Sequence, residues 1–314
     1  MKTRNKSHNL YLGVDGGGTK THAVLIDDAK NVIGEGISGV SNPLRVGIEK
    51  ATANIFAAID FAADNARRSR GDIVSAELGL AGVRRADLRE LIAKSAKQRL
   101  KIKLINVVTD AEIALYGVAI GKESLVVIAG TGSICYGRNA SGDVAVAGGW
   151  GPLAGDEGGG AGIARRALQA IAKASDGRGK PTSLSEIALD YFKANSAEDL
   201  TVAIYAPNVD NTRIAGFARH VTDEAKDGDA VAIEIIREAA NELALASKAV
   251  IQKLKLQRKK FPIGYVGGVW KVGEILSVPF LESVHEIAPK CYISEPKLEP
   301  ATAAAHMAWG SFRK

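Results

Sequence analysis

Two glycine-rich turns, each directly after a short apolar strand, constrain the fold of this chain more than any other feature. The first turn covers residues 16–21 after a strand that ends at Asp15, and the second covers residues 129–133 after the apolar run 124–128. Glycine permits a sharp turn whose unpaired backbone N–H groups can face an anion at close range. One such turn has ordinary steric explanations. Two turns in the same local pattern indicate a duplicated phosphate clamp.

The pattern around each turn is repeated as well. Each turn belongs to a set of three predicted strands, with a helix after the third strand. The first set comprises strands 10–14, 21–26 and 32–37 and the helix 48–67, and the second comprises strands 124–128, 134–137 and 144–147 and the helix 159–173. An internal fold repeat has this appearance in sequence. The alternative is a coincidence between two β-hairpins.

Length and composition are those of a globular protein with room for two domains. The chain has 314 residues, of which 46% are hydrophobic and 24% are charged. No apolar run approaches the roughly 20 residues that span a bilayer. The two cysteines, Cys135 and Cys291, lie in separate strand-like segments without metal spacing. We therefore expect a cytoplasmic protein with no membrane partner and no disulfide framework.

The net charge of +6 raises the question of nucleic acid. The densest basic run, 253–260, ends a predicted helix over 230–257, where cations complement the helix dipole. No aromatic stripe accompanies it, and aromatic residues make up only 5% of the chain, too few for a surface on which bases stack. A solvated helix end is the simpler interpretation, and no nucleic-acid partner is expected.

Strands and helices alternate after the first set, which predicts parallel strands with ligands at their carboxyl ends. The strand 101–109 leads into Asp110 and a helix over 111–120. Residues 175–228 look mostly helical and are predicted to be an insertion. We expect an N-terminal domain over residues 1–118, to which 300–314 return, and a C-terminal domain over 119–299.

Several side chains near the turns have the chemistry for phosphate and metal binding. Neither the G-x-x-x-x-G-K-[ST] nor the G-x-G-x-x-G motif occurs, so phosphate would be bound by hairpin turns. Thr19 and Thr131 bring hydroxyl groups to the turns, and Lys20 either adds charge or is simply exposed. Asp15 is a candidate ligand for Mg²⁺, which prefers oxygen donors, or an ordinary residue at a strand end.

Four further side chains have two readings each. Asp110 ends a strand, where it is either a general base or the N-cap of the next helix. Trp150 lies between glycines and forms either a pocket wall or part of the core. Asp156 and Glu157 precede a helix, where one of them is explained by a capping box, while carboxylates also accept hydrogen bonds from sugar hydroxyls.

The arrangement resembles the actin-like ATPase superfamily, which includes sugar kinases, actin and heat-shock chaperones. Within it the chain is most similar to N-acetylglucosamine kinases and bacterial glucosamine kinases. The resemblance covers most of the chain, and its most specific element is Gly-Gly-Trp-Gly at 148–151 followed by Gly-Asp-Glu-Gly at 155–158. The other segments that carry it are 13–21, 41–42, 109–110, 130–133, 215–217 and 266–271.

This resemblance implies a fold and an activity. The fold would be α/β, with duplicated ribonuclease-H-like domains and an active-site cleft between them. The activity would be transfer of the γ-phosphate of ATP, with Mg²⁺, to the 6-hydroxyl of N-acetylglucosamine or glucosamine. The partner would be a small-molecule sugar, and the assembly a homodimer.

The resemblance also implies roles for individual residues. Asp110 would be the catalytic base and Asp15 the metal ligand. The sugar would be bound by Asn42, Gly149, Trp150, Gly151 and Asp156. The nucleotide would be bound by Gly17, Gly18, Thr19, Lys20, Thr131, Gly132, Ser133, Gly216, Gly267 and Gly268. One departure concerns Leu44, which stands where the vertebrate pattern has an aromatic residue after Asn-His, so the sequence leaves the choice between the acetylated and the free amino sugar open.

Three other functions compete with this one. An ATPase activator of acyl-CoA reductases resembles these kinases but carries an iron–sulfur cluster, which needs closely placed cysteines. Cys135 and Cys291 are remote in sequence, which disfavours it. A broad-specificity hexokinase would share the fold, and a chaperone would need a peptide-binding domain for which the chain has no room.

Overall fold

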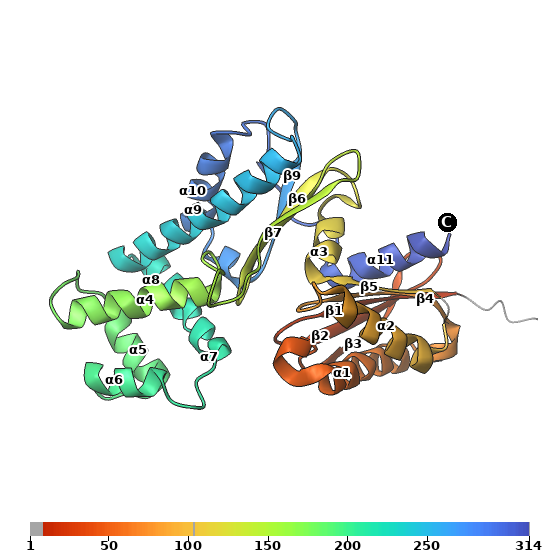
Figure 1. Cartoon of the computed structure of the whole chain (residues 1–314), viewed down its shortest axis with the longest axis horizontal. Coiled ribbons are helices and arrows are strands. Elements are labelled where there is room, and N and C mark those ends of the chain that lie inside the picture. The colour runs from red at the N-terminus through yellow and green to blue at the C-terminus, as the bar shows by residue number, and fades with distance from the viewer. Residues whose placement is uncertain (1–8, 103, 314) are drawn as a thin grey trace, which may run out of the picture. The chain divides into compact units, whose positions relative to one another are not determined.

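The computed structural model describes residues 9–102 and 104–313, so residues 1–8 and 103 of the expected N-terminal domain, and residue 314, lie outside it. The chain divides into two compact units. Unit 1 comprises Met1–Lys122 together with Pro296–Lys314, and unit 2 comprises Glu123–Glu295. Each unit is an α/β fold around one mixed five-stranded sheet (Figure 1). The α/β class expected from the sequence is confirmed.

The sheet of unit 1 has the order β3-β2-β1-β4-β5. Its first three strands form an antiparallel meander, and the last two run parallel to β1. The strands are β1 (Leu10–Gly16), β2 (Thr21–Ile26), β3 (Val32–Ser38), β4 (Ile73–Leu80) and β5 (Leu104–Thr109). Parallel pairing of β1, β4 and β5 brings their carboxyl ends to one edge, as the alternating pattern predicted.

Helices cover both faces of this sheet. On one face lie α1 (Pro43–Asn65) and α2 (Ala86–Leu100), whose apolar side chains join those of the β-strands in the core. On the other lie α3 (Asp110–Ala119) and the C-terminal helix α11 (Pro300–Phe312). Helix α11 comes so close that a Cβ at Gly13 would lie 2.1 Å from the Ala301 carbonyl oxygen. Only glycine permits this contact.

The sheet of unit 2 has the order β10-β9-β6-β7-β8. Its strands β6 (Ser124–Ala129), β7 (Ser133–Arg138) and β8 (Val144–Gly148) form the second meander, with β9 (Pro262–Val266) and β10 (Tyr292–Ile293) parallel to β6. The strand order and directions match those of unit 1, element by element. The predicted fold repeat is therefore confirmed, and a coincidence of two hairpins does not explain it.

Unit 2 is richer in helices than unit 1. Its helices are α4 (Gly160–Ser175), α5 (Leu184–Phe192), α6 (Ala197–Ile204), α7 (Asn211–Gly216), α8 (Ala218–Asp227), α9 (Ala230–Lys253), the short 3-10 helix η2 (Gly268–Val272) and α10 (Glu274–His285). Helix α9 packs on β7 and β8, and it buries one face along its whole length. The strand predicted over 291–294 is shorter than expected, so Cys291 precedes β10, whereas Cys135 lies within β7.

Among the described residues, no helix is both long and apolar enough to cross a membrane. Both cysteines are buried and unpaired.

Candidate functional site

The first glycine-rich turn joins β1 to β2 in unit 1. Strand β1 includes Asp15 and ends at Gly16. The Gly17 N–H donates to the Lys20 carbonyl at 2.9 Å, which closes the turn. Thr19 and Lys20 are exposed at its tip. The hydroxyl and the ammonium group are thus available to a ligand, and Lys20 lies in the turn, not in β2.

This turn is held from behind by neighbouring loops. The Ser41 N–H donates to the Gly17 carbonyl at 3.2 Å, and the Ala81 N–H donates to the Gly16 carbonyl at 2.8 Å. A Cβ at Gly16 would lie 2.4 Å from both Ser41 Oγ and the Leu80 side chain. Glycine is therefore required at position 16 by close packing, and the turn has one fixed position in unit 1.

Asn42 lies beside this turn at the start of α1. Its Oδ1 accepts a hydrogen bond from the Leu44 N–H at 3.0 Å and so caps the helix. Gly82, with a φ of +80°, packs against it, since a Cβ there would lie 2.3 Å from Asn42 Oδ1. Leu44 is 71% exposed, so an aliphatic side chain lies at the surface where the vertebrate pattern has an aromatic one.

Arg45, three residues after Asn42, also contacts this turn, although the sequence analysis did not single it out. Its Nη1 donates to the Gly18 carbonyl at 2.6 Å. The spacing of three residues from Asn42 would have indicated it, because residues i and i+3 share a face of a helix. The start of α1 therefore contacts the first turn through Ser41 and through Arg45.

Asp110 is the first residue of α3, directly after β5. The cap of this helix is Thr109, whose Oγ1 accepts from the Glu112 N–H at 3.3 Å, while Glu112 Oε2 accepts from the Thr109 N–H at 2.7 Å. This reciprocal pair is a capping box. The reading of Asp110 as the N-cap is therefore wrong. Its Oδ1 accepts the adjacent Ala111 N–H at 3.0 Å.

Asp15 and Asp110 influence each other electrostatically. Burial and the negative charges of Asp110 and Glu299 together raise the pKa of Asp15 to about 7, against the opposing charge of Lys20. Burial also raises the pKa of Asp110, against the hydrogen bonds from the backbone N–H groups at its helix start. Two desolvated carboxyl groups of like charge favour a proton or a cation nearby.

The chemistry of this pair fits a magnesium ion. In the part of the chain that the structure describes, no three His, Cys, Asp or Glu side chains are grouped as a metal cage. Mg²⁺ does not need one, since it keeps several waters and is commonly bound by one or two carboxylates with substrate phosphates. A cation would also relieve the charge repulsion that raises the pKa of Asp15.

The second glycine-rich turn joins β6 to β7 in unit 2. The Gly130 N–H donates to the Gly132 carbonyl at 3.0 Å. The first N–H groups of α4 support the turn from behind: Gly160 donates to the Gly130 carbonyl at 2.8 Å, and Ala161 donates to the Thr131 carbonyl at 2.9 Å. Thr131 is exposed at the tip. The helix N-terminus thus contacts the carbonyl groups of the turn.

Asp156 packs directly against this turn. Its Oδ1 accepts from the Ser133 N–H at 3.0 Å, and a Cβ at Gly132 would lie 2.5 Å from the same oxygen. The residue is 7% exposed, and burial raises the pKa of its carboxyl group. The cap of α4 is Gly159, without a side-chain hydrogen bond, so the capping-box reading of Asp156 and Glu157 is wrong.

Trp150 lies in the loop after β8 and is 73% exposed. Its neighbours Gly149 and Gly151 have φ values of +71° and +81°, in the left-handed region that favours glycine. The Gly149 N–H donates to the Ser133 carbonyl at 2.9 Å, which ties the loop to β7. The reading of Trp150 as a core residue is therefore wrong, and most of this residue is exposed at the surface of unit 2.

The three remaining glycines differ in their surroundings. Gly267, with a φ of +115°, lies against the second turn, since a Cβ there would be 2.2 Å from the Ala129 carbonyl oxygen. Gly268 is exposed with open space around it. Gly216 ends α7, where a Cβ would lie 2.5 Å from the Tyr191 hydroxyl. Gly267 thus belongs to the immediate surroundings of the second turn, and Gly216 contacts a side chain of α5.

Comparison with known proteins places these features in a family context. The sequence model of the BadF/BadG/BcrA/BcrD ATPase family matches residues 12–308. The chain is 36% identical over 297 residues to the N-acetylmuramic acid/N-acetylglucosamine kinase of Clostridium acetobutylicum, covering 95% of this chain and 97% of that one. It is 33% identical to the N-acetyl-D-glucosamine kinase of Dictyostelium discoideum, covering 97% and 99%. The glucosamine kinase of Vibrio cholerae is 31% identical, covering 76% and 79%.

A solved structure shares the fold. A candidate N-acetylglucosamine kinase from Chromobacterium violaceum superposes with a TM-score of 0.80, covering 96% of this chain and 99% of that one at 23% identity. At this identity the likeness bears on the fold alone. Together with the repeated sheet it confirms the actin-like ATPase fold that the resemblance implied.

Proposed function

The chain belongs to the BadF/BadG/BcrA/BcrD ATPase family, and we propose that it is an ATP-dependent kinase that phosphorylates the 6-hydroxyl of an amino sugar. The relatives at 31–36% identity, which carry the names of N-acetylglucosamine, N-acetylmuramic acid and glucosamine kinases, support this assignment. The observation that carries the mechanism is the environment of Asp110. Its carboxyl group is not needed as a helix cap and is desolvated, as a general base should be.

Asp110 is proposed to accept the proton of the attacking sugar hydroxyl. A carboxylate with a raised pKa is a stronger base than an exposed aspartate. Phosphoryl transfer depends mainly on in-line positioning and on neutralisation of charge, so that one base and cationic groups suffice.

The two glycine-rich turns are proposed to bind the phosphates of ATP. In unit 1 the groups are Gly17, Gly18, Thr19 and Lys20, and in unit 2 they are Thr131, Gly132 and Ser133. Exposure of both threonines and of Lys20 at the tips supports this role. Gly216, Gly267 and Gly268 are proposed to contact the adenosine part. Asp15 would hold Mg²⁺, which when bound neutralises phosphate charge.

The sugar is proposed to bind through Asn42, Gly149, Trp150, Gly151 and Asp156. The exposed indole of Trp150 offers a flat apolar surface, and the amide and carboxyl groups offer hydrogen bonds to hydroxyls. With Leu44 in place of an aromatic residue, free glucosamine rivals N-acetylglucosamine as the substrate. The name of the Clostridium relative adds N-acetylmuramic acid as a third amino sugar to test.

The competing functions are not favoured. An iron–sulfur cluster needs thiolate ligands, whereas burial raises the pKa of Cys135 to about 12 and that of Cys291 to about 11. The relatives are named as amino-sugar kinases, which also disfavours a broad-specificity hexokinase. A cytoplasmic location and a homodimer remain part of the proposal, and light scattering of the purified protein tests the dimer.

An assay that couples ADP release to an absorbance change tests the function. Glucosamine, N-acetylglucosamine, N-acetylmuramic acid, glucose and mannose would be compared under identical ATP and Mg²⁺ concentrations. We expect kcat/KM to be highest for one of the amino sugars. A preference for glucose would overturn the amino-sugar assignment while leaving the kinase intact. Absence of sugar-dependent ADP release with every sugar would overturn the kinase itself.

A further inference from the structure

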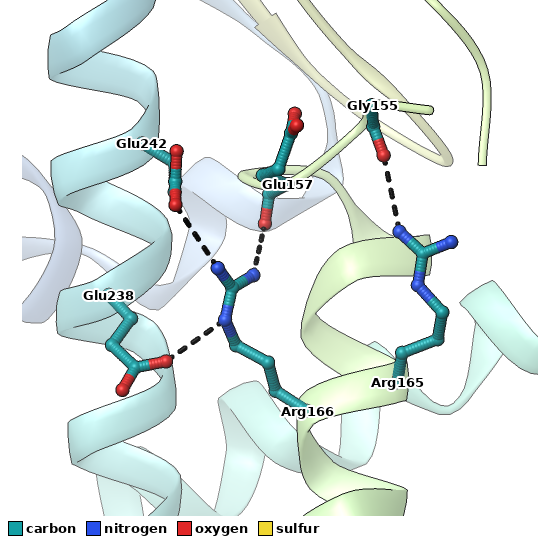
Figure 2. A network of polar contacts seen from close by, with 6 residues as sticks. All are labelled: Gly155, Glu157, Arg165, Arg166, Glu238 and Glu242. Carbon is teal, nitrogen blue, oxygen red and sulfur yellow. Dashed lines mark hydrogen bonds and ion pairs between the residues drawn. The ribbon is translucent and has the colours of Figure 1, made fainter. Parts of the chain in front are cut away.

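Two consecutive arginines of α4 hold the backbone on both sides of Asp156. Arg165 Nη2 donates to the Gly155 carbonyl at 3.1 Å, and Arg166 Nη1 donates to the Glu157 carbonyl at 2.9 Å. Figure 2 shows the two guanidinium groups reaching from the helix toward these carbonyls. The residue between them is therefore fixed at both of its peptide neighbours.

Asp156 needs such support because of its backbone. Its φ of +62° lies in the left-handed region, which is uncommon for residues other than glycine, although aspartate adopts it more readily than most. Such a conformation persists only where the surroundings over-determine it, and it is typical of functional sites. In this backbone conformation the Asp156 carboxylate accepts a hydrogen bond from the Ser133 N–H and packs against Gly132.

Arg166 is in turn oriented by helix α9. Its Nε lies 2.9 Å from Glu238 Oε2, and its Nη2 lies 3.3 Å from Glu242 Oε1. The two glutamates are four residues apart and so share one face of α9. The guanidinium thus has three acceptors around one rigid fork, an arrangement that an ammonium group cannot reproduce because it lacks the planar donors.

These contacts form one continuous chain from α9 to the second glycine-rich turn. Glu238 and Glu242 orient Arg166, Arg166 holds the Glu157 carbonyl, and the Asp156 carboxylate then holds the Ser133 N–H. The turn of residues 130–133 is the part of unit 2 proposed to bind ATP phosphate. A shift of the Asp156 backbone would therefore move a backbone N–H group of that turn.

We propose that Arg166, oriented by Glu238 and Glu242, is a positioning residue for nucleotide binding: it imposes the left-handed backbone of Asp156 and thereby sets the geometry of the second glycine-rich turn. This inference rests on the proposed function, because it takes the ligand of the turn to be ATP. It assigns a role in ATP binding to three side chains that touch no part of the turn themselves.

The test measures binding of a non-hydrolysable ATP analogue by calorimetry, which does not depend on turnover. Arg166→Ala should raise the Kd about tenfold. Arg166→Lys should behave nearly the same, because the single nitrogen of lysine cannot replace the three separate guanidinium nitrogens that reach the three acceptors. Glu242→Gln, which keeps the shape of the side chain, should raise the Kd less and in the same direction. If Arg166→Ala does not fold, the Kd of Glu242→Gln still tests the proposal.

Repeating the Arg166 substitution in an Asp156→Gly variant tests whether Arg166 acts on nucleotide binding through Asp156 or only stabilises the fold. Asp156→Gly removes the carboxylate and makes the left-handed backbone favourable. Because the bond to Ser133 is already absent in that background, adding Arg166→Ala should leave the Kd unchanged within about twofold. Equal fold-changes in both backgrounds would overturn the proposal, since Arg166 would then act independently of Asp156.

The matched control is Lys248→Ala, which removes another ion pair of α9, that of Lys248 Nζ with Glu286 at 2.6 Å. It should leave the Kd of the analogue unchanged. If Arg166→Ala binds the analogue as tightly as the wild type and only its Tm is lower, the proposed role of Arg166 is overturned, while the proposed function is not. A wild-type protein that binds no nucleotide would instead overturn the proposed function.

Discussion

The Nη1 atom of Arg45 donates a hydrogen bond to the carbonyl oxygen of Gly18 over 2.6 Å. It joins the first turn of α1, whose N-cap is Asn42, to the glycine-rich turn between β1 and β2. The Ser41 N–H adds a second link, to the Gly17 carbonyl at 3.2 Å. A residue proposed to bind sugar and a turn proposed to bind phosphate are therefore mechanically connected within unit 1.

The first prediction concerns this link. Arg45→Ala should raise KM for ATP about tenfold, because a hydrogen bond from a charged donor contributes about 1.5 kcal/mol or more. Initial-rate kinetics at saturating sugar would measure it. The control is Arg85→Ala, which removes a guanidinium paired with Asp87 at the surface before α2. Equal KM values for ATP in wild type and Arg45→Ala would remove Arg45 from the site.

The second prediction concerns the base. Asp110→Asn should lower kcat at least about 100-fold, the lower range for general-base catalysis, with little change in sugar affinity. Its Tm should stay near that of the wild type, because Thr109 and Glu112 cap α3. Thr109→Ala, by contrast, should lower the free energy of unfolding by about 1 kcal/mol, because it removes the helix cap. Normal turnover in Asp110→Asn would show that another group accepts the proton.

The third prediction concerns Trp150, whose indole is 73% exposed in contrast to the buried Trp270. Sugar binding should change the fluorescence of the wild-type protein, and Trp150→Phe should abolish most of that change while retaining activity. Trp150→Ala should raise KM for the sugar by roughly fivefold, since stacking of a ring on an apolar surface contributes on the order of 1 kcal/mol. A fluorescence change that survives in Trp150→Phe would place the sugar elsewhere.

The fourth prediction concerns the pH dependence of stability. Glu77 on β4 is 3% exposed, and burial raises its pKa to about 7 against the hydrogen bond from Asn106 Nδ2 at 3.2 Å. Since the pKa of Glu77 is higher in the folded than in the unfolded state, the folded protein binds more protons. Its contribution to stability is therefore fully present below about pH 4 and is lost as the pH rises through 7.

Glu77→Gln removes this loss, because glutamine stays neutral and still accepts from Asn106. The variant should be more stable than the wild type at pH 8 and no more stable at pH 4, as measured by urea unfolding. Asp227→Asn, at an exposed position of α8, is the control. A stability difference between Glu77→Gln and wild type that does not vary with pH would contradict the buried, titrating carboxyl group.

The sequence alone predicted the repeated meanders, because period-two apolar runs and glycine turns are local signals that need no knowledge of distant contacts. The strand 21–26 was predicted with the bounds that β2 has. The loop position of Trp150 likewise followed from its flanking glycines. The family and the kinase activity came from motifs of the same local kind.

The tertiary structure decided which reading of each polar side chain holds. The cap of α3 could have been found from the sequence, since Thr-Asp-Ala-Glu at 109–112 is a capping-box pattern. By contrast, Asp156 contacts Ser133, a residue 23 positions away in sequence, and Arg166 contacts Glu242, 76 positions away. Such partners are chosen by the packing of α4 against the turn and α9, which no pattern of neighbouring residues records.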